Sequence, residues 1–154
     1  LIQEKERERN IKKDKILEYN IPLADIAGLK KGADFKTSNG DVISNQELTE
    51  YPLPARSYAY CSDTMFSEAT IEAVRNVDVL YHEATFTSDL SSRAKKTYHS
   101  TAKQAAEVAV KAEVGKLIVG HYSARYKELD KFDEEISPVF ANYILAEDGL
   151  KIKL

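Results

Sequence analysis

The chain has 154 residues, 43% of them hydrophobic and 31% charged, which is the size and mix of one globular domain with a core of its own. The single cysteine, Cys61, excludes an internal disulfide framework and a Cys-x-x-Cys metal clamp, and it points to a reducing compartment. The 22 basic and 25 acidic side chains give a net charge of −3, which argues against a broad electrostatic grip on nucleic acid but not against a local one.

The first third of the chain shows little regular periodicity. The stretch Glu4–Asp14 alternates acids and bases around a single apolar residue, so we expect a solvated helix or loop there. Farther along, Pro22 interrupts the chain, and the dipeptide Asn39-Gly40 predicts a tight turn. We therefore expect residues 1–54 to be a connecting region.

From Arg56 onward, short apolar runs alternate with helical periodicity, which is typical of layered α/β structure. No apolar run approaches the roughly 18–20 residues of a membrane span, so we expect no membrane partner and a cytoplasmic location. The expected strands are Ser57–Ser62, Val77–Tyr81 and Lys116–Gly120, the expected helices are Ser67–Asn76, Thr101–Glu113 and Leu129–Phe140, and Tyr143–Ala146 with Leu150–Leu154 is expected to form a terminal hairpin.

Polar side chains collect where the three clearest strands end. These ends read Ser62-Asp63-Thr64, His82-Glu83-Ala84-Thr85 and Gly120-His121-Tyr122-Ser123. In open α/β sheets, ligands bind at the carboxyl ends of the strands, so the three ends predict one site. The remaining histidine, His99, stands just before a predicted helix, where unpaired backbone N–H groups favour an anion.

Each of these residues also has an ordinary structural interpretation. Asp63 is compatible with a turn or helix cap, His82 with a buried core histidine, and His121 with a bond to a backbone carbonyl. Taken together, however, Asp and His are ligands that zinc accepts, and Glu83 is the kind of neighbour that fixes an imidazole tautomer. Asp63 and His121 alone do not complete a zinc site, which normally takes at least three protein ligands.

The motifs of the second half resemble those of a known family. The segments Tyr60–Thr64, His82–Phe86, His99–Thr101 and Gly120–Tyr126 are similar, in order, to ribonuclease Z, the tRNA 3′-processing endonucleases of the metallo-β-lactamase superfamily. The resemblance implies an α/β fold, namely the C-terminal half of an αββα sandwich with one mixed sheet and covering helices. Within such a half-domain, residues 55–154 would form the β/α core that carries the metal and catalytic motifs.

The resemblance also implies roles at the metal site. Asp63 would bridge two zinc ions, and His121 would be a ligand of one of them. Bridging is physically sensible because an anionic oxygen offsets the repulsion between two cations about 3.5–4 Å apart. His99 would contact the scissile phosphate and act as the acid for the departing ribose oxygen, with Glu83 or His82 in support.

Two further residues are candidates for substrate binding. Ser123 and Arg125 follow His121, and a guanidinium fork is suited to an RNA phosphate. A surface ion pair is the alternative interpretation of Arg125.

Part of the family pattern is missing from this chain. Its three histidines cannot supply the N-terminal His-x-His-x-Asp-His cluster that provides most of the zinc ligands, and we expect the family's protruding tRNA-gripping arm to be absent as well. We therefore expect the chain to be catalytically incomplete and to pair with the missing N-terminal half or with a second copy as a homodimer. The complete enzyme would use two Zn²⁺ ions to remove the 3′ trailer from precursor tRNA.

Two other functions remain open. One is a different phosphodiesterase or hydrolase of the metallo-β-lactamase fold. The other is a non-catalytic half-domain that binds RNA or a partner chain, for which RNA binding would survive Asp63→Ala.

Overall fold

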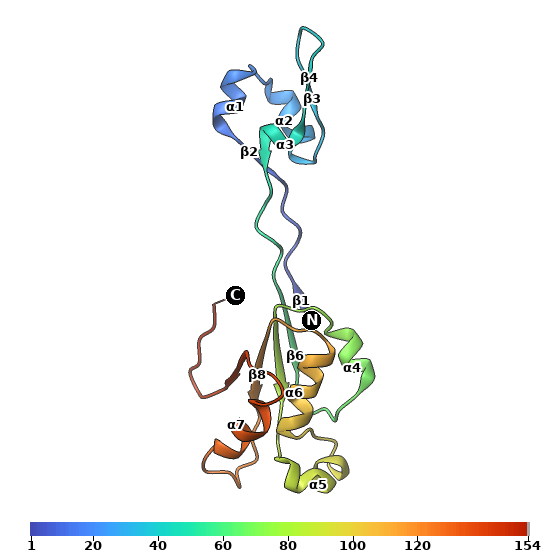
Figure 1. Ribbon diagram of the computed structural model, residues 1–154, viewed down its shortest axis with the longest axis vertical. Helices are drawn as coiled ribbons and strands as arrows, with labels where there is room; N and C mark the ends of the chain where they lie inside the picture. The colour runs from blue at the N-terminus through green and yellow to red at the C-terminus, as the bar shows by residue number, and fades with distance from the viewer. Residues whose placement is uncertain (154) are drawn as a thin grey trace. The chain divides into compact units, whose positions relative to one another are not determined.

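The structure is a computed structural model that describes residues 1–153, and it divides into two compact units (Figure 1). The core unit consists of Leu1–Glu4 and the chain from Arg56 onward. The inserted unit consists of Lys5–Ala55. Each unit has a hydrophobic cluster of its own, so each is described separately.

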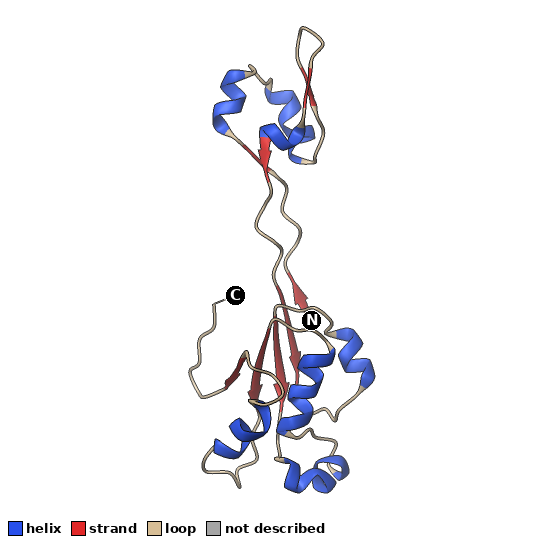
Figure 2. Ribbon diagram, in the orientation of Figure 1, coloured by secondary structure: helices blue, strands red, loops and turns tan. Residues whose placement is uncertain are grey.

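The core unit is built on a five-stranded mixed sheet (Figure 2). In spatial order its strands are β1 (Ile2–Gln3), β6 (Ser57–Cys61), β7 (Val79–Glu83), β8 (Lys116–Gly120) and β9 (Tyr143–Leu145). The short β1 runs antiparallel to β6, and the other neighbours are parallel. The carboxyl ends of β6, β7 and β8 therefore meet at one edge, where the predicted site residues stand.

Helices cover one face of this sheet. They are α4 (Glu68–Ala73), α6 (Ala102–Lys111) and α7 (Asp130–Ile136). A 3₁₀ turn at Ser88–Leu90 and the helix α5 (Ser91–Lys96) lie beyond the carboxyl ends of the strands (Figure 1). The core lies between them and the alternate strand residues Leu80, Leu117 and Val119, all of which are fully buried.

The central helix α6 shows why this layer forms. Thr101 and Gln104 make a reciprocal capping box, in which the Thr101 side chain accepts the Gln104 N–H and the Gln104 side chain accepts the Thr101 N–H. The helix buries a stripe of small residues at helical spacing, including Ala102, Ala105 and Ala109. Small side chains let the helix lie close to β7 and β8, which it contacts.

The structure confirms the expected order of strands and helices, but it moves several boundaries. The strand at Lys116–Gly120 has the expected bounds, whereas β7 begins and ends two residues later than expected. His82 and Glu83 therefore belong to the strand instead of following it. The helices α4, α6 and α7 are each shorter than the helices that the apolar periodicity predicted.

The predicted terminal hairpin is wrong for the described residues. β9 pairs in parallel with β8, and residues 146–153 form no strand, while Leu154 lies outside the described residues. The alternation of Leu150 and Ile152 reflects packing instead. Both side chains line a cavity of about 290 Å³ over the sheet, together with Val79 and Ile118.

The sheet face opposite the helices is apolar and aromatic. Tyr58, Tyr60 and Tyr81 alternate with residues of the helix-covered core, and the rings of Tyr60 and Tyr81 stack at 4.7 Å. Tyr60 is 61% exposed. An exposed stacked pair of this kind is typical of a surface that a further layer covers.

The inserted unit contains more structure than a connecting region. Its elements are β2 (Asn10–Ile11), α1 (Lys13–Glu18), α2 (Leu23–Lys30), β3 (Phe35–Lys36), β4 (Val42–Ile43), α3 (Asn45–Leu48) and β5 (Thr49–Glu50). Leu29, Phe35 and Leu48 are buried in its core. The buried Asn45 amide donates to the carbonyls of Leu29 and Ala33, which ties α3 to the end of α2.

Within the charged stretch Glu4–Asp14, the structure places a short strand. β2 pairs antiparallel with β5, and β3 pairs with β4 around the expected turn at Asn39-Gly40. None of the helices formed by residues 1–153 has the length and apolar character needed to cross a lipid bilayer.

Candidate functional site

Three of the predicted site residues converge at the carboxyl edge of the sheet. One ligand atom each from Asp63, His99 and His121 lies within 4.8 Å of the other two. His121 Nε2 is 3.6 Å from Asp63 Oδ1, and the imidazole rings of His99 and His121 are 5.5 Å apart between centroids. The three side chains come from the end of β6, the segment before α6 and the end of β8.

Asp63 and His121, the two candidate ligands that follow strands, have an unusual backbone conformation. Asp63 has φ = 50° and His121 has φ = 62°, the left-handed region that side chains other than glycine seldom adopt. Such a conformation costs on the order of 1–3 kcal/mol and is concentrated at functional sites. The preceding Gly120 is also required, because a Cβ there would lie 2.4 Å from the Tyr81 hydroxyl.

Glu83 is the buried anchor of the site. Its side chain is 0% exposed, and both carboxylate oxygens are fully engaged. Oε1 accepts the Thr64 backbone N–H at 3.2 Å and lies 2.7 Å from His99 Nδ1, while Oε2 accepts the Thr85 N–H and hydroxyl, both at 2.8 Å. A carboxylate only accepts, so His99 donates from Nδ1 and its Nε2 stays available at the site.

Thr85 links the two histidines to this carboxylate. Its Oγ1 donates to Glu83 Oε2 and lies 2.9 Å from His121 Nδ1 and 3.2 Å from His99 Nδ1. A hydroxyl has one hydrogen, so after donating to Glu83 it acts toward His121 as an acceptor. His121 therefore carries its proton on Nδ1, which leaves the lone pair of Nε2, the nitrogen beside Asp63, free to bind a cation.

Thr64 and Thr85 are residues of the candidate site that the sequence did not single out. Both stand inside the motifs that carried the resemblance, directly after Asp63 and two residues after Glu83. Only the fold shows that the strand ends bring the Thr85 hydroxyl between two histidines.

The structure does not bring His82 into this group. Its side chain is 0% exposed within the sheet, and Nδ1 lies 2.7 Å from the Glu83 backbone carbonyl oxygen. Nε2 is buried and has no hydrogen-bond partner within residues 1–153. Because β7 extends two residues farther than predicted, His82 stays inside the strand, and its side chain does not reach the cluster.

Burial of His82 predicts a pH dependence of stability. Desolvation lowers the pKa of His82, so the unfolded chain binds this proton more readily than the folded one. The contribution of neutral His82 to the free energy of unfolding is fully present above about pH 6.5. It is lost as the pH falls from there through the lower pKa of His82 in the folded chain, by up to about 1.4 kcal/mol per pH unit. Urea unfolding over a pH series measures it. In His82→Asn, which can still donate to the Glu83 carbonyl, this component should vanish; an unchanged pH profile would contradict the assignment.

Ser123 and Arg125 lie in the loop after His121. The Arg125 side chain donates from Nε to Ser123 Oγ at 2.9 Å, and the Ser123 backbone N–H donates to the Thr85 carbonyl at 3.0 Å. The guanidinium carbon of Arg125 is 5.1 Å from the Phe86 ring centroid, and Arg125 makes no ion pair with a carboxylate of residues 1–153. The alternative interpretation of Arg125, a surface ion pair, is therefore wrong within the described residues.

The donor set suits a divalent metal ion. One carboxylate and two imidazoles are ligands of zinc, and a catalytic zinc keeps a further position for water. Manganese and iron accept the same ligand types. Three donors are too few for two zinc ions, so within the described residues a dinuclear site has only part of its ligands.

Comparisons with known proteins agree with this geometry. The family model "Beta-lactamase superfamily domain" matches residues 44–122. "Ribonuclease Z" of Parabacteroides distasonis is 44% identical over all 154 residues, and that of Porphyromonas gingivalis W83 is 45% identical over the same length. The chain covers 51% of each, so it spans about half the length of the curated relatives it matches.

Solved structures give the same result for the fold. The long form of RNase Z from yeast aligns with a TM-score of 0.51 and 34% identity over 58% of this chain and 12% of that chain. The metallo-beta-lactamase fold protein YhfI from Bacillus subtilis aligns with a TM-score of 0.50 and 24% identity over 55% of this chain and 34% of that chain, which supports the fold alone. The expected α/β fold and the resemblance to the C-terminal half of ribonuclease Z are thus confirmed, and the chain belongs to the beta-lactamase superfamily.

Proposed function

We propose that this chain supplies part of the active site of a zinc-dependent endoribonuclease that removes the 3′ trailer from precursor tRNA. The observation that carries the proposal is the convergence of Asp63, His99 and His121, with the buried Glu83 bonded to His99. Relatives named ribonuclease Z match the whole chain and support the substrate class. Because the chain spans half their length, the remaining ligands would come from a segment outside it.

Asp63 and His121 would hold the metal, with two zinc ions in the complete site. When bound, the ions would activate water and polarise the phosphate. The Asp63 carboxylate is suited to bridge because it offers two oxygens and stands 71% exposed at the edge of the sheet. His121 would bind through Nε2, the nitrogen that its bond to Thr85 leaves unprotonated.

His99 would transfer a proton to the ribose 3′-oxygen as it departs. Its Nδ1 is held by Glu83, so the acidic proton would be the one on Nε2. The bond from Nδ1 to the buried carboxylate orients the ring and fixes the direction in which this proton is delivered. Ser123 and Arg125 would bind the RNA phosphate beside it.

The part of this sheet face that Leu150 and Ile152 leave exposed, around Tyr60, would pack against the other half of the sandwich. Tyr60 and its stacked partner Tyr81 favour an apolar partner surface over water. In the absence of that half, a second copy of the chain would cover the same face, giving a homodimer. The lone cysteine and the tRNA substrate favour a cytoplasmic location.

Reconstitution tests the proposed function. The N-terminal half of the Parabacteroides distasonis relative, mixed with this chain and zinc, should cleave precursor tRNA and leave a 3′-hydroxyl on the tRNA. Cleavage of small phosphodiesters but not of tRNA would instead favour another hydrolase of this fold. RNA binding without cleavage, unchanged in Asp63→Ala, would favour a non-catalytic module.

The inserted unit is our candidate for the tRNA-gripping arm, contrary to the expectation from the sequence that this arm is absent. It is compact, and the chain ends that flank it meet in the core unit, where the Glu4 N–H donates to the Arg56 carbonyl at 2.8 Å. Replacing Lys5–Ala55 by a short Gly-Ser linker should therefore leave the core unit folded.

For this excision we expect the thermal midpoint of the core unit to stay within about 8 °C, while the Kd for precursor tRNA rises at least about tenfold. Circular dichroism melts and fluorescence anisotropy with the reconstituted enzyme measure the two quantities. Unchanged tRNA affinity would contradict the assignment of the arm.

Thr85 predicts a separable effect on the metal. Thr85→Val keeps the shape but removes the hydroxyl that fixes the His121 tautomer, so the zinc affinity should fall about 10- to 100-fold. Titration calorimetry measures the affinity, and ¹⁵N NMR of the imidazoles should show a mixture of His121 tautomers. Thr85→Ser should retain both properties; a Val variant with the original affinity and tautomer would contradict the role.

A further inference from the structure

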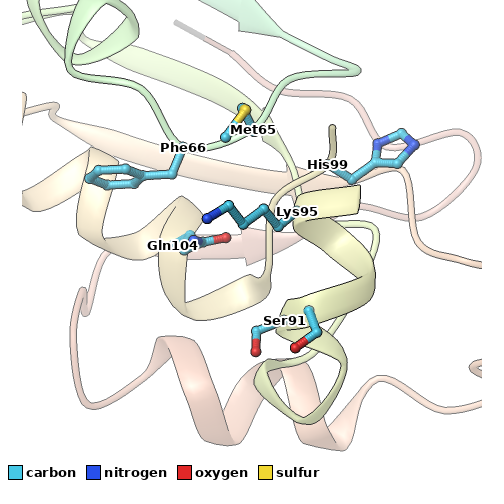
Figure 3. Close-up of a pocket in the computed structure, with 7 residues that line it drawn as sticks. Met65, Phe66, Ser91, Lys95, His99 and Gln104 are labelled. Carbon is cyan, nitrogen blue, oxygen red and sulfur yellow. The ribbon is translucent and has the colours of Figure 1, made fainter. Parts of the chain in front are cut away.

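A cavity beside His99 shares only this residue with the cluster of Asp63, His99 and His121. Its volume is about 380 Å³, and Figure 3 shows that its walls come from the loop after Asp63, from α5 and from the start of α6. The side chains that matter here are Phe66, Ser91, Ser92, Lys95, His99 and Gln104. In Figure 3 the Lys95 side chain extends toward Phe66 and Gln104, while the imidazole of His99 points to the other side.

The polar groups of this cavity are those that bind an anion. Lys95 has no carboxylate within ion-pair distance among residues 1–153, whereas Lys111 on α6 pairs with Glu68 at 3.1 Å. Neither serine hydroxyl has a hydrogen-bond partner in the described part of the chain. No acidic residue lines the cavity. An ammonium group and two free hydroxyls without a carboxylate favour a phosphate.

The remaining wall is suited to a nucleobase. Phe66 is only partly buried against the core and stands beside Met65 in the same cavity. Aromatic side chains next to a cationic group stack the bases of single-stranded RNA. The amide oxygen of Gln104 is used by the helix cap, and this leaves its NH₂ group to donate to a base or ribose.

The position of His99 indicates which nucleotide of the substrate would occupy the cavity. If His99 protonates the ribose 3′-oxygen, the ribose that carries this oxygen lies against His99. That ribose belongs to the nucleotide on the 5′ side of the scissile bond, the last one retained in the tRNA. We propose that the cavity between Phe66 and Lys95 is the subsite for this nucleotide, with its base on Phe66 and its 5′-phosphate on Lys95. This inference rests on the proposed function.

Salt dependence of RNA binding tests the phosphate contact. A short fluorescein-labelled single-stranded RNA is titrated with the chain at several salt concentrations. Lys95→Ala should reduce the slope of log K against log salt by about 0.7, the value for one single-strand phosphate. Lys96→Ala, an exposed residue of the same helix outside the cavity, should leave the slope unchanged, and Lys95→Arg should restore it.

The base contact has its own signature. Phe66→Leu keeps an apolar side chain in the core but removes the stacking surface, so affinity should fall about tenfold with no change in the salt slope. Circular dichroism melts verify that each variant is folded.

The outcomes separate this inference from the proposed function. RNA binding with the same slope in Lys95→Ala as in the unsubstituted chain would overturn the subsite and leave the nuclease intact. Inorganic phosphate that displaces the RNA completely, with Phe66→Leu unaffected, would show a free-phosphate site and also overturn it. Absence of RNA binding by both the chain and its complex with the N-terminal half would overturn the proposed function itself.

Discussion

Asp63→Asn is expected to abolish cleavage of precursor tRNA in the reconstituted enzyme. The substitution keeps the size of the side chain and its tolerance of the left-handed backbone at φ = 50°, so the fold should survive. It removes the negative charge that would hold both metal ions. Metal ions contribute several kcal/mol of transition-state stabilisation, so we expect a loss in kcat of at least about 10³-fold.

Two measurements accompany this variant. Zinc content by mass spectrometry should fall together with activity, and the thermal midpoint in the absence of metal should not. Asp148→Asn, the same substitution at an exposed carboxylate whose side chain has no partner among residues 1–153, is the matched control and should retain zinc and activity. Full activity in Asp63→Asn would show that the carboxylate is not a ligand.

Glu83→Gln is expected to have the second largest effect. The carboxylate receives hydrogen bonds from Thr64, from both the backbone and hydroxyl of Thr85, and from His99. An amide offers an NH₂ group where one oxygen accepted, so at least one buried donor loses its partner, at a cost of about 1–3 kcal/mol in unfolding free energy. Loss of the hydrogen bond that orients the His99 imidazole should lower kcat by about 10²–10⁴-fold.

A double-mutant cycle separates the catalytic effect from the structural one. If Glu83 acts through His99, the double variant Glu83→Gln/His99→Gln should be no slower than His99→Gln alone, because the two residues act as a unit. Multiplicative losses in the double variant would contradict the pairing.

The order of strands and helices was predictable because, in the second half of the chain, each local apolar pattern indicates the same element that the fold contains. The apolar run at Lys116–Gly120 and the alanine stripe of α6 each have one stable solution, a buried strand and a helix packed closely on it. The polar residues at strand ends then predicted one edge for the site. Parallel strands bring such ends together whatever the loops do between them.

Other features could not be predicted without the three-dimensional structure. The inserted unit depends on side chains such as Leu29 and Leu48, which are far apart in sequence and show no periodicity. The last apolar alternation, at Leu150 and Ile152, has the period of a strand but is used to cover the sheet. In the sequence, His82 and Glu83 were equally good candidates for the site, yet the pleat of β7 places adjacent side chains on opposite faces of the sheet. Only one of the two can therefore reach the edge of the site.

Anomalous X-ray diffraction at the zinc edge, on crystals of the chain grown with zinc, tests the central claim most directly. We expect a zinc peak within bonding distance of an Asp63 carboxylate oxygen and His121 Nε2, with Thr85 still hydrogen-bonded to His121 Nδ1. A zinc ion bound elsewhere on the chain, with the Asp63 and His121 side chains turned away from each other, would contradict it.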